Sequence, residues 1–361
     1  MKMRKLTACA ASAAMILGLL SGAVFAGETE AAVDTTNLGT LYETMPTDSV
    51  VVTLDQIEAV ETDQEYTVGL AMAYGLTTPF YTTLANSFMD EAEKLGLKVL
   101  LADCESDSQV QVGKIENFIA QKVDAMVVLP CDPNDAITPV LEKVFAADIP
   151  VMTFDVPPAD GAKYLATFAT DAYALGYAVG ESLTQMALET FPEGEIEFGI
   201  IGGVQGIPTP TNRNNGMRDA IAAVDTEGRM KEVSFLYAGA FTEESGLETG
   251  ENMLIANPNM KVIFGTCDAH CIGAASAAKR QGRDDVIMGG VDGSKAAMQI
   301  MQHGGPIKVL ALNSPNDMGR ATARAMAAYL TNGTIPESRN MVIDGGVVTP
   351  DTVDEYIDTA F

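Results

Sequence analysis

The stretch YTVGLAMA (66–73) and the following YGLTTPFYTTLANSFMDEAEKLG (74–96) decide the fold. The first is an apolar run of strand length, and the second has a proline before two adjacent aromatic rings, as a helix start does. Apolar residues recur from Phe80 to Leu95 at near-helical spacing, which predicts one buried stripe. Tyr81 lies about 100° around that helix from Phe80. Both rings therefore cannot enter the same stripe, and one of them faces something else.

Strand-length apolar runs and helix-length amphipathic stretches alternate along most of the chain. Later strand-length runs include DAMVVLP (124–130), EFGIIGG (197–203) and IKVLAL (307–312). Strands and helices that take turns predict right-handed βαβ units and parallel sheets covered on both faces. Because about ten such runs exceed one ordinary sheet, we predict an α/β protein with two doubly wound parallel-sheet lobes and a ligand cleft between them.

Unusual polar and aromatic residues gather where the expected strands end. In open α/β sheets, ligands bind outside the carboxyl ends of the strands. At least one ring of the pair at 80–81 is therefore expected to face the cleft. The residues at these ends are 77–81, Asp103, Cys104, 130–132, Asp155, Arg213, Phe241, Cys267, Asp268, Asp292 and Asn313.

The chain opens with the order of a secretory signal peptide. A charged MKMRK head precedes the short apolar run AASAAMILGLLSGAVFA (10–26), which ends in a small-residue cleavage signal. We expect residues 1–26 to be a signal peptide cleaved after Ala26, and the protein to be exported to the periplasm or the extracellular face of the cell membrane. LTAC (6–9) resembles a lipoprotein acylation box, but we reject it because it precedes the apolar run.

The composition limits the classes of partner. The 361 residues carry a net charge of −27, and loss of residues 1–26 removes three basic residues and no acid. Such a surface repels nucleic acid and anionic lipid and favours a neutral or cationic ligand. The chain is long enough to build its core without disulfides, so we expect free thiols at all four remaining cysteines, which are Cys104, Cys131, Cys267 and Cys271.

The segment after the signal peptide reads as a spacer. Residues 27–65 contain no Lys or Arg and show little periodicity apart from SVVVTLDQI (49–57), which predicts at most one short strand. We expect the folded body to begin near Tyr66. The predicted N-terminal lobe comprises 66–170 plus 314–343, and the C-terminal lobe comprises 171–313 plus 344–361.

The ordered series of segments resembles the type I periplasmic binding proteins, in particular the ribose- and galactose-type sugar-binding branch of ABC importers. The resemblance covers roughly residues 66–348 and does not reach the spacer. The segments are TTPFY, MVVLPCDPNDAI, IPVMTFD, ATDAYALGYAVGE, TNRNNGMRDAI, VIFGTCDAHCIGAA, GGVDGS and LNSPNDMGRATARAMAAYL.

This resemblance implies a role for several of the strand-end residues. The TPFY segment supplies two rings that clamp the sugar faces, and Phe241 is implied to stack in the second lobe. Asp155 and Asp292 are implied to accept from hydroxyl groups, and Arg213 to donate to ring and hydroxyl oxygens. The predicted ligand-binding residues are Thr78, Phe80, Tyr81, Asp155, Arg213, Phe241, Cys267, Asp292 and Asn313.

Several positions depart from the pattern of the sugar binders. Cys267 stands where they carry an asparagine, and Val156 where ribose binders carry an arginine. Asn313 replaces their usual glutamine, and Leu129 or Cys131 stands at another asparagine position. These changes leave the fold prediction intact and point to a ligand that is less polar at one end than ribose.

The sequence motifs give little support to an enzymatic function. SAAK (276–279) has no companion motif of the serine acyltransferases, and CDAHC (267–271) lacks a second pair with zinc-site spacing. We therefore expect a non-enzymatic, monomeric solute-binding protein without cofactor or metal. It would deliver a small sugar-like ligand to an ABC permease. The alternative is a sensor of the same fold that presents its ligand to a receptor kinase or chemoreceptor.

Overall fold

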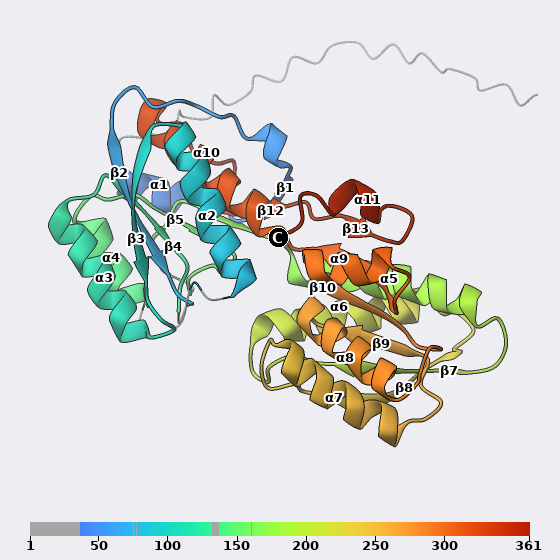
Figure 1. Cartoon of the computed structure of the whole chain (residues 1–361). Coiled ribbons are helices and arrows are strands. Elements are labelled where there is room, and N and C mark those ends of the chain that lie inside the picture. Colours follow the sequence, from blue (N-terminus) through green and yellow to red (C-terminus); the bar gives the residue numbers. More distant parts are fainter. Residues whose placement is uncertain (1–36, 75, 77, 132–136, 160) are drawn as a thin grey trace, which may run out of the picture. The chain divides into compact units, whose positions relative to one another are not determined.

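The first lobe of the computed structural model is built on a seven-stranded sheet (Figure 1). The structure describes residues 37–74, 76, 78–131, 137–159 and 161–361. The strand order is β1-β12-β6-β5-β4-β2-β3, and every neighbouring pair is parallel. The strands are β1 (Ser49–Val52), β2 (Tyr66–Met72), β3 (Leu97–Asp103), β4 (Ala125–Val128), β5 (Val151–Phe154), β6 (Thr167–Ala169) and β12 (Asn340–Ile343).

Helices cover both faces of this sheet because side chains alternate along each strand. On β2, Leu70 and Met72 enter the core shared with α1, α2 and α10, whereas Ala71 enters the core shared with α3 and α4. These helices are α1 (Leu38–Thr44), α2 (Pro79–Lys94), α3 (Ser108–Gln121), α4 (Ile137–Ala146) and α10 (Pro315–Asn332).

The second lobe is built on a six-stranded sheet in the order β13-β11-β10-β9-β7-β8. All its neighbouring pairs are parallel except β11 with β13, which is antiparallel. The strands are β7 (Ile196–Ile201), β8 (Met230–Leu236), β9 (Val262–Gly265), β10 (Ile287–Asp292), β11 (Ile307–Leu312) and β13 (Val347–Val348).

This sheet is also covered on both faces. On β7, Ile200 enters the core shared with α5 and α6, and Ile201 enters the core shared with α7 and α8. The two sheets confirm the predicted α/β class with two doubly wound lobes. The helices are α5 (Ala172–Thr190), α6 (Pro208–Val224), α7 (Glu243–Ala256), α8 (Asp268–Arg280), α9 (Lys295–Gln302) and α11 (Val353–Tyr356).

The chain passes between the two sheets three times. It leaves the first sheet after β6, returns to it after β11, and leaves it again after β12. We call the connecting segments 170–171, 313–314 and 344–346 the crossover segments. Each of them follows the carboxyl end of a strand, where ligands of open α/β sheets bind.

The segment before Tyr66 differs from the sequence prediction. Helix α1, strand β1 and the short 3-10 helix η1 (Leu54–Gln56) all precede that residue. Strand β1 pairs with β12 in register, and Leu41 of α1 is fully buried in the core. The prediction that the folded body begins near Tyr66 is therefore wrong, because part of the supposed spacer completes the first sheet.

The structure bears on the predicted free cysteines but not on the predicted signal peptide. The predicted signal peptide lies outside the described residues. Within the described ranges, no helix combines the length and the apolar character that a membrane crossing requires. None of the described cysteines, which are Cys104, Cys131, Cys267 and Cys271, forms a disulfide bond.

Candidate functional site

Arg213 is held in place by the close packing of α5 on α6. A Cβ atom at Gly176 of α5 would lie 2.0 Å from the carbonyl oxygen of Arg213, so only glycine permits this approach. The buried Arg213 side chain donates from Nη1 to the Thr266 carbonyl oxygen at 2.7 Å. Its Nη2 lies 3.2 Å from Asp292 Oδ1. The guanidinium therefore points at the carboxyl end of β10.

Asp292 ends β10 in a backbone conformation that few residues adopt. Its φ angle is 127°, and the following Gly293 has a φ of 80°. The Asn313 side chain donates from Nδ2 to Asp292 Oδ1 at 3.1 Å, and Thr170 Oγ1 donates to Asn313 Oδ1 at 2.6 Å. Because Thr170 occupies the amide oxygen, the Asn313 amide nitrogen must face Asp292. Two crossover segments thus meet at one carboxylate.

Burial dominates the electrostatics of the two site carboxylates. It raises the pKa of Asp155 to about 6, although the Arg213 charge opposes the shift. It also raises the pKa of Asp292, against the opposing effects of the Arg213 guanidinium and the Asn313 hydrogen bond. Each carboxylate disfavours ionisation of the other. The site therefore holds more negative charge than Arg213 neutralises.

Asp155 follows β5 of the first lobe. Its φ angle is 62°, and its backbone N–H donates to the Phe168 carbonyl oxygen at 3.0 Å. Within the described residues its carboxylate makes no ion pair or hydrogen bond to another side chain. The charges of Asp155 and Asp292 both raise the pKa of Tyr81, after burial as the main cause. Tyr81, Asp155, Arg213 and Asp292 thus lie within electrostatic reach of one another.

An aromatic cluster forms beside these charges at the start of α2. Phe80 and Tyr81 meet edge to face with ring centroids 5.3 Å apart. The ring centroids of Tyr81 and Tyr74 lie 4.7 Å apart. Phe361 meets the Phe80 ring edge to face at 5.7 Å. Phe80 and Tyr81 are both half-buried, so neither is a full member of the core. The predicted stripe continues with Leu84 and Phe88, which are fully buried or nearly so.

Phe241 has a partner that the sequence prediction missed. Its ring stacks on His270 with centroids 6.0 Å apart and stays 46% exposed. The buried His270 is fixed by contacts to Thr266 Oγ1 at 3.1 Å and to the Ala240 carbonyl oxygen at 2.8 Å. Burial lowers the pKa of His270. A neutral imidazole therefore supports an aromatic ring that has one open face.

Residues 267 and 268 begin helix α8. Cys267 is the N-cap residue and is buried, and burial raises its pKa. Asp268 accepts from the Ser294 backbone N–H, and burial and the nearby Asp292 charge raise its pKa well above the usual range. Its Oδ1 atom is buried without a hydrogen-bond partner within the described residues. The sequence prediction placed Asp268 at a strand end without a role in binding, and it considered His270 only as a possible metal ligand within CDAHC.

The nine predicted residues are not equally well placed. Arg213, Asp292 and Asn313 are in direct contact, and Asp155 and Tyr81 lie within electrostatic reach of them. Thr78 is the exposed N-cap residue of α2 and makes no side-chain cap bond. Leu129, named above as a departure from the sugar binders, is fully buried in the core and cannot border a ligand.

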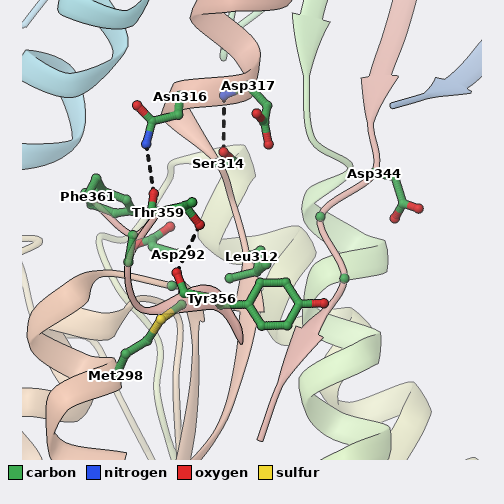
Figure 2. Close-up of a pocket in the computed structure, with 14 residues that line it drawn as sticks. Asp292, Met298, Leu312, Ser314, Asn316, Asp317, Asp344, Tyr356, Thr359 and Phe361 are labelled. Carbon is green, nitrogen blue, oxygen red and sulfur yellow. Dashed lines mark hydrogen bonds between the residues drawn. The ribbon is translucent and has the colours of Figure 1, made fainter. Parts of the chain in front are cut away.

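A cavity of about 370 Å³ adjoins the Asp292 end of the site (Figure 2). Two crossover segments contribute Ser314 and 344–346, and the chain end contributes Tyr356 and 359–361. Asn316 donates to the Thr359 carbonyl oxygen at 3.2 Å, and the Lys295 N–H donates to the Phe361 carbonyl oxygen at 2.8 Å. These bonds fix the wall formed by the chain end. Within the described residues, no group of three or more His, Cys, Asp or Glu side chains is placed to hold a metal ion.

Known proteins resemble this chain over most of its length. A family model described as "Periplasmic binding protein domain" matches residues 68–334. The ribose import binding protein of Bacillus subtilis (strain 168) is 28% identical over 235 residues, which cover 65% of this chain and 72% of that protein. The galactofuranose-binding protein of Escherichia coli (strain K12) is 27% identical over 300 residues, covering 81% and 90%. A crystal structure of a galactofuranose binding protein superposes with a TM-score of 0.70 at 25% identity, covering 81% of this chain and 98% of that one.

Proposed function

We infer the function from one premise: this chain belongs to the periplasmic binding protein family, whose model matches residues 68–334. Relatives at 26–28% identity are named as binding proteins for ribose import, for D-apiose import and for galactofuranose. Such proteins are transport components and not enzymes, as the sequence predicted. We propose that this chain is the solute-binding protein of an ABC importer, and that it binds a small sugar-like ligand in the cleft between its lobes.

The observation that carries this proposal is the shared carboxylate of Asp292. Arg213 and Asn313 both approach its Oδ1 atom, which leaves Oδ2 able to accept from a ligand hydroxyl. Sugar hydroxyls both donate and accept, so they pair with carboxylates and with guanidinium or amide donors. The rings of Phe80, Tyr81 and Phe241 offer apolar faces for the sugar C–H groups.

The ligand is proposed to be less polar at one end than ribose. Leu129 no longer supports this idea, so it rests on the half-buried Val156 and on Cys267, which is buried but lies within electrostatic reach of Asp292 and Arg213. A site that lacks a hydroxyl partner does not strongly reject a ligand without that hydroxyl. A deoxy or methylated sugar is therefore expected to compete well with ribose. Tighter binding of ribose than of every such analogue would refute this part of the proposal.

A thermal-shift screen of the mature protein tests the binding function. Sugars, polyols, nucleosides and autoinducers form the panel, and calorimetry follows for each compound that raises the melting temperature. A ligand that binds only the folded state raises it by mass action. We expect at least one sugar or sugar derivative to bind at micromolar concentration or better. If only compounds without sugar character bind, the proposed ligand class is wrong.

The proposed place of work is outside the cytoplasmic membrane, with the ABC permease as partner and the protein as a monomer. The charged head, apolar run and small-residue signal that end at Ala26 support export. We expect the measured mass of the intact native protein to equal that of a chain that begins at Gly27. An intact Met1, or a lipid on Cys9, would contradict export by this route. The relatives from Bacillus subtilis and Actinobacillus succinogenes are named as import binding proteins, which favours transport over the sensor alternative.

A further inference from the structure

The cavity next to Asp292 is joined to the proposed sugar site by two residues. Asp292 lines the cavity and also pairs with Arg213, and Phe361 lines it and also contacts Phe80. The volume of about 370 Å³ falls within the range of small-molecule sites, roughly 300–1,000 Å³. A ligand held at Asp292 and Phe80 therefore has space beside it for a substituent.

The lining of this cavity is acidic. Asp292, Asp317 and Asp344 line it, and none of its described lining residues is Lys or Arg (Figure 2). Within the described residues, the carboxylates of Asp317 and Asp344 make no ion pair and accept no hydrogen bond. Arg213 is the only cationic side chain among the predicted ligand residues and the cavity lining, and Asp292 already pairs with it. The cavity thus repels an anionic group and leaves carboxylates without a cationic partner.

Two aromatic rings complete the lining. Tyr356 and Phe361 border the cavity (Figure 2), and the Tyr356 hydroxyl makes no hydrogen bond within the described residues. Aromatic faces attract an ammonium group through their quadrupole, and carboxylates attract it through charge. A methyl or phosphate substituent would be attracted less strongly by these rings and carboxylates, because it carries no positive charge.

We propose that the cavity is a substituent pocket of the ligand site and that the transported ligand is an amino-substituted sugar, whose ammonium group enters the cavity that Asp317, Asp344 and Tyr356 help to line. This inference rests on the proposed sugar-binding function and narrows its ligand class. The sugar ring remains at Arg213, Asp292 and the aromatic cluster.

Calorimetry with matched sugars tests the inference on the full mature protein. The probes are D-glucose, D-glucosamine and N-acetyl-D-glucosamine, with D-galactose, D-galactosamine and N-acetyl-D-galactosamine as a second set. In at least one set, the amino sugar is expected to bind ten-fold or more tightly than the parent sugar and the acetylated form. Acetylation keeps the nitrogen and removes its charge, so it separates charge from size. The preference should shrink as the pH rises and the ammonium loses its proton.

Three variants locate the effect. Asp344→Asn and Asp317→Asn are each expected to lower the ratio of amino-sugar to parent-sugar affinity at least five-fold. Asp351→Asn is the matched control, because that exposed residue lies in the same part of the chain and does not line the cavity. Its affinity ratio should equal that of the parent protein. Thermal melting checks that each variant is folded.

The outcomes separate this inference from the proposed function. If parent sugars bind and amino sugars bind no better in either set, the inference is wrong and the sugar-binding function stands. If the amino preference appears but survives both Asp substitutions, the assignment of the cavity is wrong. If neither sugars nor amino sugars bind, the proposed function fails and this inference fails with it.

Discussion

At the residue scale, Arg213 is the side chain on which recognition depends most. It is buried, and it connects the Thr266 carbonyl oxygen to the Asp292 carboxylate. Arg213→Ala should weaken ligand binding by roughly 2–4 kcal/mol, because a buried partner is left unpaired. Arg218→Ala is the control, since Arg218 lies on the same helix and pairs with Glu232 away from Asp292. Calorimetry that finds equal affinity for both variants would contradict the site assignment.

Also at the residue scale, we expect the buried carboxylate of Asp155 to lower the stability of the ligand-free protein and to strengthen ligand binding. Burial raises its pKa to about 6 in the folded protein, whereas an unfolded aspartate titrates near ~4. The folded state thus binds more protons between these values, and stability falls as the pH rises through that window. Asp155→Asn should stabilise the ligand-free protein at pH 7 by about 1–3 kcal/mol and should lose this advantage below pH ~4.

Urea unfolding of the ligand-free protein at the two pH values measures the effect of Asp155→Asn. The same substitution should weaken ligand binding, because the ligand loses a charged acceptor. Asp351→Asn, at an exposed position, should change neither quantity. A stability gain that is equal at both pH values would show that the buried charge is not its cause.

Residue identities at the site were partly readable from the sequence. Asp292 ends β10 and Asn313 follows β11, so strand-end reasoning finds them, whereas Arg213 lies inside α6 and matched the sugar binders through its segment TNRNNGMRDAI. Thr170, His270 and Phe361 escaped it for a physical reason: each acts through a partner distant in the sequence. Thr170 meets Asn313 and Phe361 meets Phe80, and no local pattern reports such pairs.

At the element scale, the crossover segments hold the site together. Thr170 from the first crossover fixes the amide of Asn313 in the second, and that amide donates to Asp292. Thr170→Val keeps the side-chain shape and removes the hydroxyl donor, which frees the amide to rotate. We expect a loss of about 1 kcal/mol in ligand binding, roughly five-fold in affinity. Thr170→Ser restores the hydroxyl and should restore most of the affinity.

Calorimetry at several pH values distinguishes this role of Thr170 from a purely structural one. The Asn313 hydrogen bond opposes the rise in the pKa of Asp292. Its loss in Thr170→Val should move the acidic limb of ligand binding to higher pH. If affinity falls without any change in the pH profile, Thr170 supports the fold and does not position Asn313.

Strand β1 shows what local patterns leave out at this scale. Its four residues pair with β12 almost three hundred positions later in the chain. The surrounding segment is acidic and has little periodicity, so its composition indicated a spacer. The pairing stabilises a parallel edge strand through contacts that no window of neighbouring residues contains. Alternating strands and helices from Tyr66 onward carried a strong local signal, and there the prediction was right.

At the scale of the whole molecule, three crossover segments and two separate sheets predict hinge motion. Segments 170–171, 313–314 and 344–346 carry the chain between the lobes, and two of them also line the cavity beside Asp292. Few backbone torsions need to change for the lobes to move as rigid bodies, because each lobe has its own cores. Closure around a ligand excludes water and strengthens the charged hydrogen bonds in the site.

Small-angle scattering of the mature protein tests this motion. Saturation with a ligand confirmed by calorimetry should reduce the radius of gyration, since both lobes gain contacts with one molecule. Arg213→Ala at the same ligand concentration is the control, because it keeps the fold and loses the affinity that would hold the lobes closed. A ligand shifts such an equilibrium only by its difference in affinity for the two states. An unchanged radius at saturation in the parent protein would therefore mean that the ligand binds one lobe alone, and that Arg213 and Asp155 do not act on the same molecule.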